Sequence, residues 1–321
     1  MTFSWKRYIA SVLPNCATGE PSGILVRMSL PSQLRSFASK LPKLPEYIWF
    51  LARSRYSPKF GGWYSIAPDG SRLIRREFLH GYTFYCMITP TDLRIPLEGL
   101  CDLDTTVDLI LRRHYEGMER HVQPGSIVWD VGANLAVVSL MFAQHPNVTR
   151  VYAYEPFPHT FDCAQRSLAA NSDLAPKIML EPVGIGERDG ELAISYTEKA
   201  KSAIGLSEIP PFLVARYRLT PRDMRSVTIQ IADADRILRS IRERHPNAPI
   251  LLKIDAEGAE YGIIDRLART GSLDEIYYAV IEWHSNPGEK YLTSRLQSAG
   301  FQCSAKIHEA DNSIGIIDAW R

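Results

Sequence analysis

Acidic residues follow two neighbouring apolar segments in the middle of the chain. Asp130 comes directly after residues 127–129, and Glu155 comes directly after residues 150–154. A buried strand that ends in a small-residue turn, here at Gly132, is typical of ligand sites in open α/β sheets. Because adjacent parallel strands end at the same edge, Glu155 is expected beside that turn, where its carboxylate could accept hydrogen bonds from both hydroxyls of a ribose. The pattern predicts a ligand that contains a nucleoside.

The turn itself argues against a nicotinamide dinucleotide. That fingerprint needs three glycines, whereas residues 132–136 contain only Gly132, which leaves a pyrophosphate a poorer seat. A ligand without phosphates, held by side chains, fits this turn better. A simpler alternative remains for Glu155, which could merely cap the helix that follows Pro156.

A second acidic group follows two later apolar segments. Asp255 and Glu257 come after residues 250–254, and Glu282 and His284 end the segment that begins at residue 276. Carboxylates and an imidazole at one sheet edge are candidates for removing a proton from a hydroxyl group. Crowding of carboxylates should raise the pKa of one of them toward neutrality.

The same residues have other interpretations. Glu257 could simply supply negative charge near a helix start, and a lone histidine such as His284 is commonly a loop residue. Asp255, Glu282 and His284 could also bind a divalent cation, but their spacing matches no established metal motif, so no metal is expected.

The elements that must position these residues alternate between strands and helices. Strands are expected at 127–130, 150–154, 177–183, 250–254 and 276–283, separated by helices, with a further short strand at 190–196. A final hairpin of two strands is expected between residues 300 and 320. Alternation of this kind predicts an α/β fold with a doubly wound, mostly parallel seven-stranded sheet. The hairpin adds an antiparallel edge.

Three regions are expected along the chain. Residues 1–60 form a basic, proline-punctuated arm with short helices, residues 61–103 a small antiparallel β-meander, and residues 104–321 the α/β domain. Residues 1–80 contain twelve Lys/Arg and four Asp/Glu, whereas the whole chain has a net charge of +1. The arm is interpreted mainly as a solvated segment; contact with a membrane surface or a second subunit is the alternative.

Composition narrows the class of protein further. The 45% hydrophobic and 23% charged content is that of an ordinary soluble globular protein. The five cysteines are scattered and odd in number, which indicates reduced thiols rather than disulfides or zinc. The sequence has no apolar run long enough to span a membrane and no clear signal peptide, so a cytoplasmic location is the default expectation.

Three motifs resemble one known family. The strings VWDVGAN at 128–134, YAYEP at 152–156 and LLKIDAEGAEYGII at 251–264 are similar to those of FkbM-type S-adenosylmethionine-dependent methyltransferases. The resemblance covers roughly residues 82–321, and the third string is its most specific part. It implies a Rossmann-like methyltransferase fold with S-adenosyl-L-methionine as methyl donor.

The resemblance also implies roles for individual residues. The expected donor site comprises Asp130, Gly132 and Asn134 along the methionine end, Glu155 on the ribose, Val183 near the adenine, and Tyr115 and Glu116 on a helix before the sheet. The expected catalytic group is Asp255, Glu257, Glu282 and His284. One departure is Ala136, where the family usually has glycine; its methyl group is expected to weaken donor binding.

The implied reaction is O-methylation of a hydroxyl on a sugar, glycan or natural product. Two alternatives stay open, a catalytically silent donor-binding module and a nicotinamide-dependent oxidoreductase. A nucleic-acid substrate is not expected, because no basic and aromatic platform is found beyond the arm. The acceptor and the oligomeric state do not follow from the sequence.

Overall fold

The computed structural model describes residues 115–200, 221–284, 287–308 and 311–321 without a break. It also describes strands and short pieces between residues 55 and 109, and several positions within 201–220. The expected basic arm at 1–60, apart from one short strand, lies outside the described residues. In the described part, no helix is both long and apolar enough to cross a membrane.

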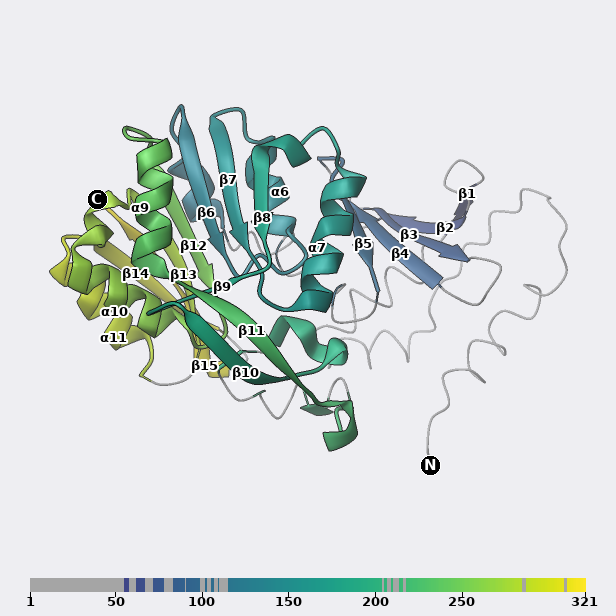
Figure 1. Ribbon diagram of the computed structural model, residues 1–321. Coiled ribbons are helices and arrows are strands. Elements are labelled where there is room, and N and C mark those ends of the chain that lie inside the picture. The colour runs from purple at the N-terminus through teal and green to yellow at the C-terminus, as the bar shows by residue number, and fades with distance from the viewer. Residues whose placement is uncertain are drawn as a thin grey trace, which may run out of the picture. The chain divides into compact units, whose positions relative to one another are not determined.

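A seven-stranded sheet forms the centre of the fold (Figure 1). Its strands are β6 (Ser126–Val131), β7 (Val148–Tyr154), β8 (Ile178–Glu181), β12 (Ile250–Asp255), β13 (Tyr278–His284), β14 (Gln302–His308) and β15 (Asp311–Trp320). The order is β14-β15-β13-β12-β6-β7-β8, in which only β15 runs antiparallel to its neighbours. The predicted mostly parallel sheet with an antiparallel C-terminal hairpin is confirmed.

Helices connect the parallel strands and flank the sheet. They are α5 (Glu116–Arg120), α6 (Val137–Gln144), α7 (Pro158–Ala170), α9 (Ala234–Arg244), α10 (Glu260–Thr270) and α11 (Glu289–Ser298), with short 3₁₀ turns η2 (Ala175–Lys177), η3 (Glu198–Ala203), η4 (Pro221–Asp223) and η5 (Ser272–Glu275). The largest buried cluster joins one face of β6 and β12 to α9, α10 and α11. Alternate residues of the same strands therefore point to the opposite face. Only the last turn of the helix expected before the sheet, α5, is described continuously.

The strand order reverses between β6 and β12. The chain first proceeds outward through β7 and β8, then returns to β12 beside β6 and proceeds the other way through β13. In open α/β sheets, ligands bind at the carboxyl ends of the strands at such a reversal. The topology therefore places a candidate site at the ends of β6 and β12.

Two smaller sheets accompany the central one. Strands β1 (Arg55–Ser57), β2 (Gly62–Ile66), β3 (Arg72–Glu77), β4 (Thr83–Ile88) and β5 (Arg94–Leu97) pair in sequence order as an antiparallel meander. Strands β9 (Gly184–Gly186), β10 (Gly190–Tyr196) and β11 (Arg225–Asp233) form a three-stranded sheet in the order β10-β11-β9. This second small sheet was not expected from the sequence, and it lies next to the candidate site.

Candidate active site

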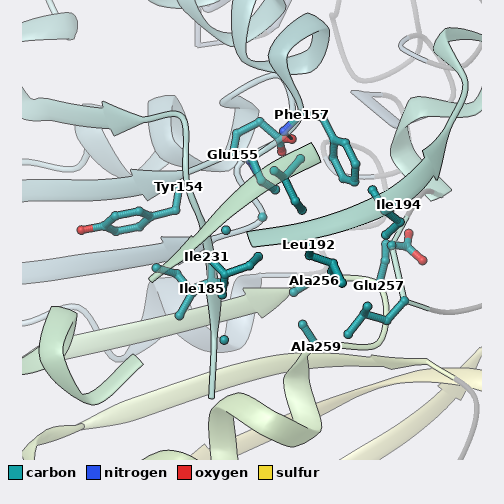
Figure 2. Close-up of a pocket in the computed structure, with 18 of the residues that line it drawn as sticks. Tyr154, Glu155, Phe157, Ile185, Leu192, Ile194, Ile231, Ala256, Glu257 and Ala259 are labelled. Carbon is teal, nitrogen blue, oxygen red and sulfur yellow. Dashed lines mark hydrogen bonds between the residues drawn. The ribbon is translucent and has the colours of Figure 1, made fainter. Parts of the chain in front are cut away.

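A cavity of about 360 Å³ lies where the strand order reverses. Its lining includes Gly132 and Asn134 from the turn after β6, Glu155 after β7, and Asp255 and Glu257 after β12. Figure 2 shows Glu155 and Glu257 on different elements around this space. Pockets of this size accommodate drug-sized or nucleoside-sized ligands.

The turn after β6 brings two backbones into contact. Gly132 has φ of +78°, and a Cβ atom at this position would lie 1.8 Å from the carbonyl oxygen of Asp255. Asn134 and Ala136 also have positive φ, of 50° and 60°. Glycine adopts this conformation most easily, so the methyl group of Ala136 carries a backbone cost of about 1 kcal/mol. The positive-φ residues Gly132 and Asn134 line the cavity, and Ala136 follows them at the start of α6.

The Glu155 side chain links the two neighbouring strand ends. Its Oε2 accepts the Asn134 N–H at 2.9 Å, and its Oε1 accepts the Phe157 N–H at 3.1 Å, just before α7. Burial raises the pKa of Glu155 to about 7, although these two hydrogen bonds act in the opposite direction. The carboxylate thus caps a helix start and also lines the cavity; the two roles are compatible.

Lys253 is the buried cation beneath the turn. It lies directly opposite Asp130 in the register of β12 and β6, and its Nζ is 3.1 Å from Asp130 Oδ1. The same Nζ donates to the carbonyl oxygens of Gly132 at 2.5 Å and Val131 at 3.3 Å. Asp130 Oδ2 accepts a hydrogen bond from Ser139 of α6 at 2.5 Å. Lys253 therefore fixes the turn, and Asp130 holds Lys253.

A cluster of acids surrounds His284 at the ends of β12 and β13. Asp255 and Glu282 are register partners across these strands. His284 Nε2 lies 3.6 Å from Glu257 Oε2 and 3.9 Å from Glu282 Oε1, and its Nδ1 lies 3.4 Å from Glu260 Oε1. We call Asp255, Glu257, Glu260, Glu282 and His284 the acidic cluster.

Burial and mutual repulsion shape the protonation of the acidic cluster. Burial raises the pKa of Glu257 to about 7, and burial together with the charge of Asp255 raises that of Glu282 to about 8. Burial would lower the pKa of His284, but Glu257, Glu260 and Glu282 hold it well above its usual value. The cluster therefore exchanges protons in the range in which a general base for a hydroxyl group works.

The three-stranded sheet supplies the apolar wall of the cavity. Leu192 and Ile194 of β10 and Ile185 of β9 line it, together with Phe157, which stacks on Tyr196 at 5.1 Å between ring centroids. Figure 2 shows these apolar side chains grouped around the space beside Glu155. An apolar wall with a few converging polar groups is characteristic of small-molecule sites.

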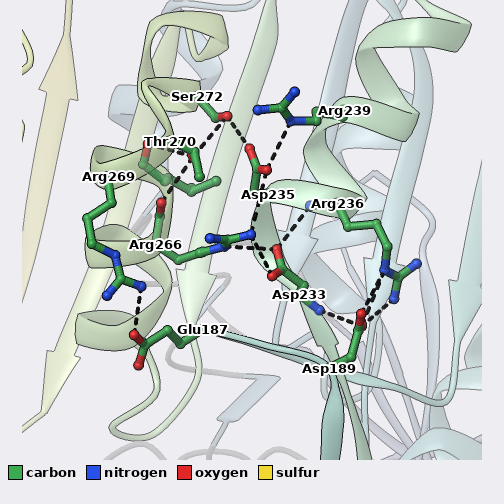
Figure 3. Close-up of polar contacts among 11 residues, drawn as sticks. Glu187, Asp189, Asp233, Asp235, Arg236, Arg239, Arg266, Arg269, Thr270 and Ser272 are labelled. Atoms are coloured by element: carbon green, nitrogen blue, oxygen red, sulfur yellow. Dashed lines mark hydrogen bonds and ion pairs between the residues drawn. The ribbon is translucent and has the colours of Figure 1, made fainter.

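The connection from β9 to β10 is fixed to the helices by ion pairs (Figure 3). Glu187 binds Arg269 of α10 at 2.6 Å, and Asp189 binds Arg236 of α9 at 2.6 Å. Arg266 continues the network to Asp233 at 2.9 Å. Exposed pairs of this kind stabilise weakly one by one, but they hold this part of the cavity wall in place.

The structure separates the residues that were expected to act together. Gly132, Asn134, Glu155, Asp255 and Glu257 line the cavity. The remaining candidates are not part of its lining: Asp130, Glu282, His284, Tyr115, Glu116 and Val183. Of the second set, Asp130 and His284 contact lining residues or their turns, as described above.

Glu282 is the register partner of Asp255, which lines the cavity, and lies 3.9 Å from His284. The other three residues occupy different surroundings. Tyr115 is 3% exposed, beside the charges of Asp255, Glu282 and Asp130. Val183 packs against the central core, and the neighbouring Gly184 and Ile185 line the cavity. Glu116 is half-exposed and pairs with Arg120 at 3.5 Å.

Several residues of the site escaped sequence analysis. Ser139 acts through Asp130, and nothing in its local sequence marks this contact. Glu260 belongs to the motif at 251–264, but its contact with His284 could not be read from that motif. Leu192 and Ile194 had a signal, because they alternate along a predicted strand. The partner strands of that segment could not be read from the pattern.

The cavity fits the donor that the sequence motifs imply. Contact between the two backbones at Gly132 leaves no room for a side chain there, and a buried carboxylate stands beside the turn. Glu155 would hold the ribose and the turn from Gly132 to Asn134 the amino-acid end.

Comparison with known proteins identifies a family over more than half of the chain. Residues 130–303 match the model of the methyltransferase FkbM domain. A search of the curated proteins gave no significant match.

Distant similarities exist among solved structures. A methyltransferase FkbM from Methylobacillus flagellatus KT has 16% identity and a TM-score of 0.38, covering 68% of this chain and 53% of that one. The chain thus spans about half the length of that protein. A precorrin-6y C5,15-methyltransferase from Geobacter metallireducens GS-15 has 15% identity and a TM-score of 0.35, with coverages of 65% and 88%. A Streptococcus pneumoniae protein in complex with S-adenosyl-L-methionine has 16% identity and a TM-score of 0.38, with coverages of 65% and 73%.

Proposed function

Because the chain belongs to the FkbM methyltransferase family, we propose that it methylates a hydroxyl group on a sugar, glycan or other natural product. S-adenosyl-L-methionine supplies an electrophilic methyl group. The acceptor hydroxyl forms the new C–O bond and loses its proton, and S-adenosylhomocysteine leaves. The chain's own contribution is to bind both reactants in line and to take up that proton.

One observation carries this proposal: a single cavity joins the donor-type turn to the acidic cluster. Its lining includes Glu155 and Gly132 as well as Asp255 and Glu257. An acceptor bound near Asp255 and Glu257 would have carboxylates within reach of its hydroxyl. Asp255 and Glu257 are the candidate proton acceptors. His284, whose pKa the neighbouring carboxylates hold well above its usual value, is the cation that orients them together with Glu282.

Donor binding is the first test. Titration calorimetry with S-adenosyl-L-methionine should show saturable binding that Glu155→Ala weakens at least roughly tenfold, since two ribose hydrogen bonds to a charged group are lost. Glu243→Ala, an exposed change on α9, is the matched control and should bind as the parent does. Absence of binding, or equal binding by both variants, would falsify the assignment.

The acidic cluster is tested by separating turnover from binding. Asp255→Asn keeps the shape of the side chain but removes its charge, so turnover with a labelled donor and an acceptor panel should fall by roughly 10²–10⁴. Donor affinity should stay within about twofold. Equal losses in turnover and donor affinity would instead place Asp255 in the donor site.

A further inference from the structure

Three side chains of the acidic cluster converge in a way that suits a metal ion. Asp255, Glu257 and His284 each offer one ligand atom, and these atoms lie within 4.8 Å of one another. They come from the ends of β12 and β13 and the turn between β12 and α10. Two carboxylate oxygens and one imidazole nitrogen form a ligand set for ions such as Mn²⁺ or Fe²⁺.

His284 is already oriented as a ligand. Glu260 is fully buried, and its Oε2 accepts the Gly258 N–H at 2.8 Å while its Oε1 accepts the His284 N–H at 2.7 Å. The same Oε1 lies 3.4 Å from His284 Nδ1. This leaves Nε2 turned toward Glu257. Metal-bound histidines usually donate their other ring N–H to a carboxylate. Glu260 stands at the right ring nitrogen for this role, although Nδ1 does not yet form a hydrogen bond within the described residues.

An independent observation points to a missing ligand beside the cluster. Tyr115 is 3% exposed, and its hydroxyl group has no hydrogen-bond partner within the described residues. Tyr115 precedes α5, which packs against β13, the strand that carries Glu282 and His284. Burial raises the pKa of the Tyr115 phenol, and the charges of Asp255 and Glu282 add to this effect. A buried hydroxyl without a partner is costly. Water bound to a cation would supply that partner.

The charge balance also favours a cation. Four carboxylates belong to the acidic cluster, whereas among the described residues Lys253 and a protonated His284 are the cations that face it, and Lys253 is engaged mainly by Asp130. Because an imidazole binds a metal ion only after it loses its proton, the ion would replace the charge of His284. Buried carboxylates this close repel one another unless a positive charge lies between them. The sulfonium of a donor could offset part of this charge, but it offers no coordination for an imidazole nitrogen.

We propose that Asp255, Glu257 and His284 bind one divalent cation of the Mn²⁺ type, with Glu260 as the positioning residue behind His284. Binding of the ion is independent of the reaction. Its role rests on the proposed function: an ion at this point polarises the acceptor hydroxyl and lowers the pKa of that group, so that the proton leaves more easily.

The test uses Mn²⁺ itself and the full chain, freed of metal by a chelator and without donor. Loss of the free Mn²⁺ signal in electron paramagnetic resonance should report one equivalent bound. Glu257→Gln and His284→Gln should each weaken this binding at least roughly tenfold. Circular dichroism verifies that each variant is folded. Glu257→Gln is the variant expected to disturb folding least, because the Glu257 side chain lines the cavity.

The chain offers its own matched control. Glu98, His159 and Cys163 form another cluster with ligand atoms within 4.8 Å. Arg166 and Lys201 already bind Glu98 in this second cluster, so His159→Gln should leave Mn²⁺ binding unchanged. No uptake by the parent protein would overturn the proposal, as would equal uptake by the parent and both cluster variants. Loss of binding in His159→Gln alone would also overturn it.

The outcomes also separate the ion from the reaction. Mn²⁺ uptake without methyl product from any acceptor would retain the cation site and reject the proposed reaction. Methyl transfer that is unchanged after chelation would reject the catalytic role of the ion.

Discussion

Two buried lysines form ion pairs with acidic residues in this fold, one within the central sheet and one between separate segments. Lys253 lies within the central sheet and pairs with the fully buried Asp130 on the adjacent strand. Lys201 lies in η3 and binds Asp102 at 3.0 Å and Glu98 at 3.2 Å. Both lysine side chains are 3% exposed or less. In both cases the neighbouring acids raise the lysine pKa although burial opposes this.

The difference lies in what each lysine orders. Lys253 donates to two backbone carbonyls of the turn at Gly132, so its ion pair is built into the wall of the cavity. Lys201 joins side chains from three separate segments, including Cys163 of α7 at 3.1 Å. Burial raises the pKa of the Cys163 thiol to about 11, so this group stays a thiol. Lys253 shapes the turn at the site, whereas Lys201 fastens separate segments to one another and itself lines the cavity.

Replacement of Lys253 should have the largest effect. Lys253→Met leaves the charge of Asp130 buried without its cation, which should lower the free energy of unfolding by about 3–5 kcal/mol. The double variant with Asp130→Asn should recover much of this loss, because the unpaired charge is gone. Urea denaturation measures both, with the exposed Lys290→Met as control. A loss below about 1 kcal/mol would show that the ion pair between Lys253 and Asp130 contributes little to stability.

Replacement of Lys201 should have a smaller effect. Asp102 again loses its cation, but Glu98 is 34% exposed and is also bound by Arg166 and His159, so water and these cations compensate. Lys201→Met should lower the free energy of unfolding by about 1–3 kcal/mol in the same urea assay. If Lys201→Met and Lys253→Met lower the free energy of unfolding equally, the two lysines do not differ in their contribution to stability.

The acidic residues around Lys253 and the cavity could largely be predicted from sequence, because they follow strands. Asp130, Glu155, Asp255 and Glu282 come at or just after apolar segments, and parallel strands end at one edge. The register that pairs Lys253 with Asp130 was not predictable, since the strand order and stagger depend on contacts far apart in the chain.

The group of side chains around Lys201 could not be predicted from sequence at all. Glu98 follows a short strand of the meander, His159 and Cys163 lie on α7, and Lys201 lies in a 3₁₀ turn. No periodic pattern connects these segments, so only tertiary packing brings them together. The same reason explains why the β9–β11 wall was missed: Leu192 and Ile194 alternate as a strand should, but their partner strand lies beyond a long connection.

Glu155 extends the comparison to a buried acid that is held by backbone N–H groups rather than by a lysine ion pair. Its pKa of about 7 is above the ordinary value, so the folded protein keeps the proton longer than the unfolded chain does. Its contribution to the free energy of unfolding is therefore full below about pH 4.5 and is lost as the pH rises to about 7.

Donor binding should follow the opposite course, because only the ionised carboxylate accepts hydrogen bonds from both ribose hydroxyls. The affinity for the donor should fall by up to about tenfold per pH unit below pH 7. Calorimetry and urea denaturation from pH 5.5 to 8.5, each expressed as the difference between the parent and Glu155→Gln, remove the titration of Glu257 and Glu282 from the comparison. If both differences vanish across this range, Glu155 is neither a titrating group there nor a contact of the donor.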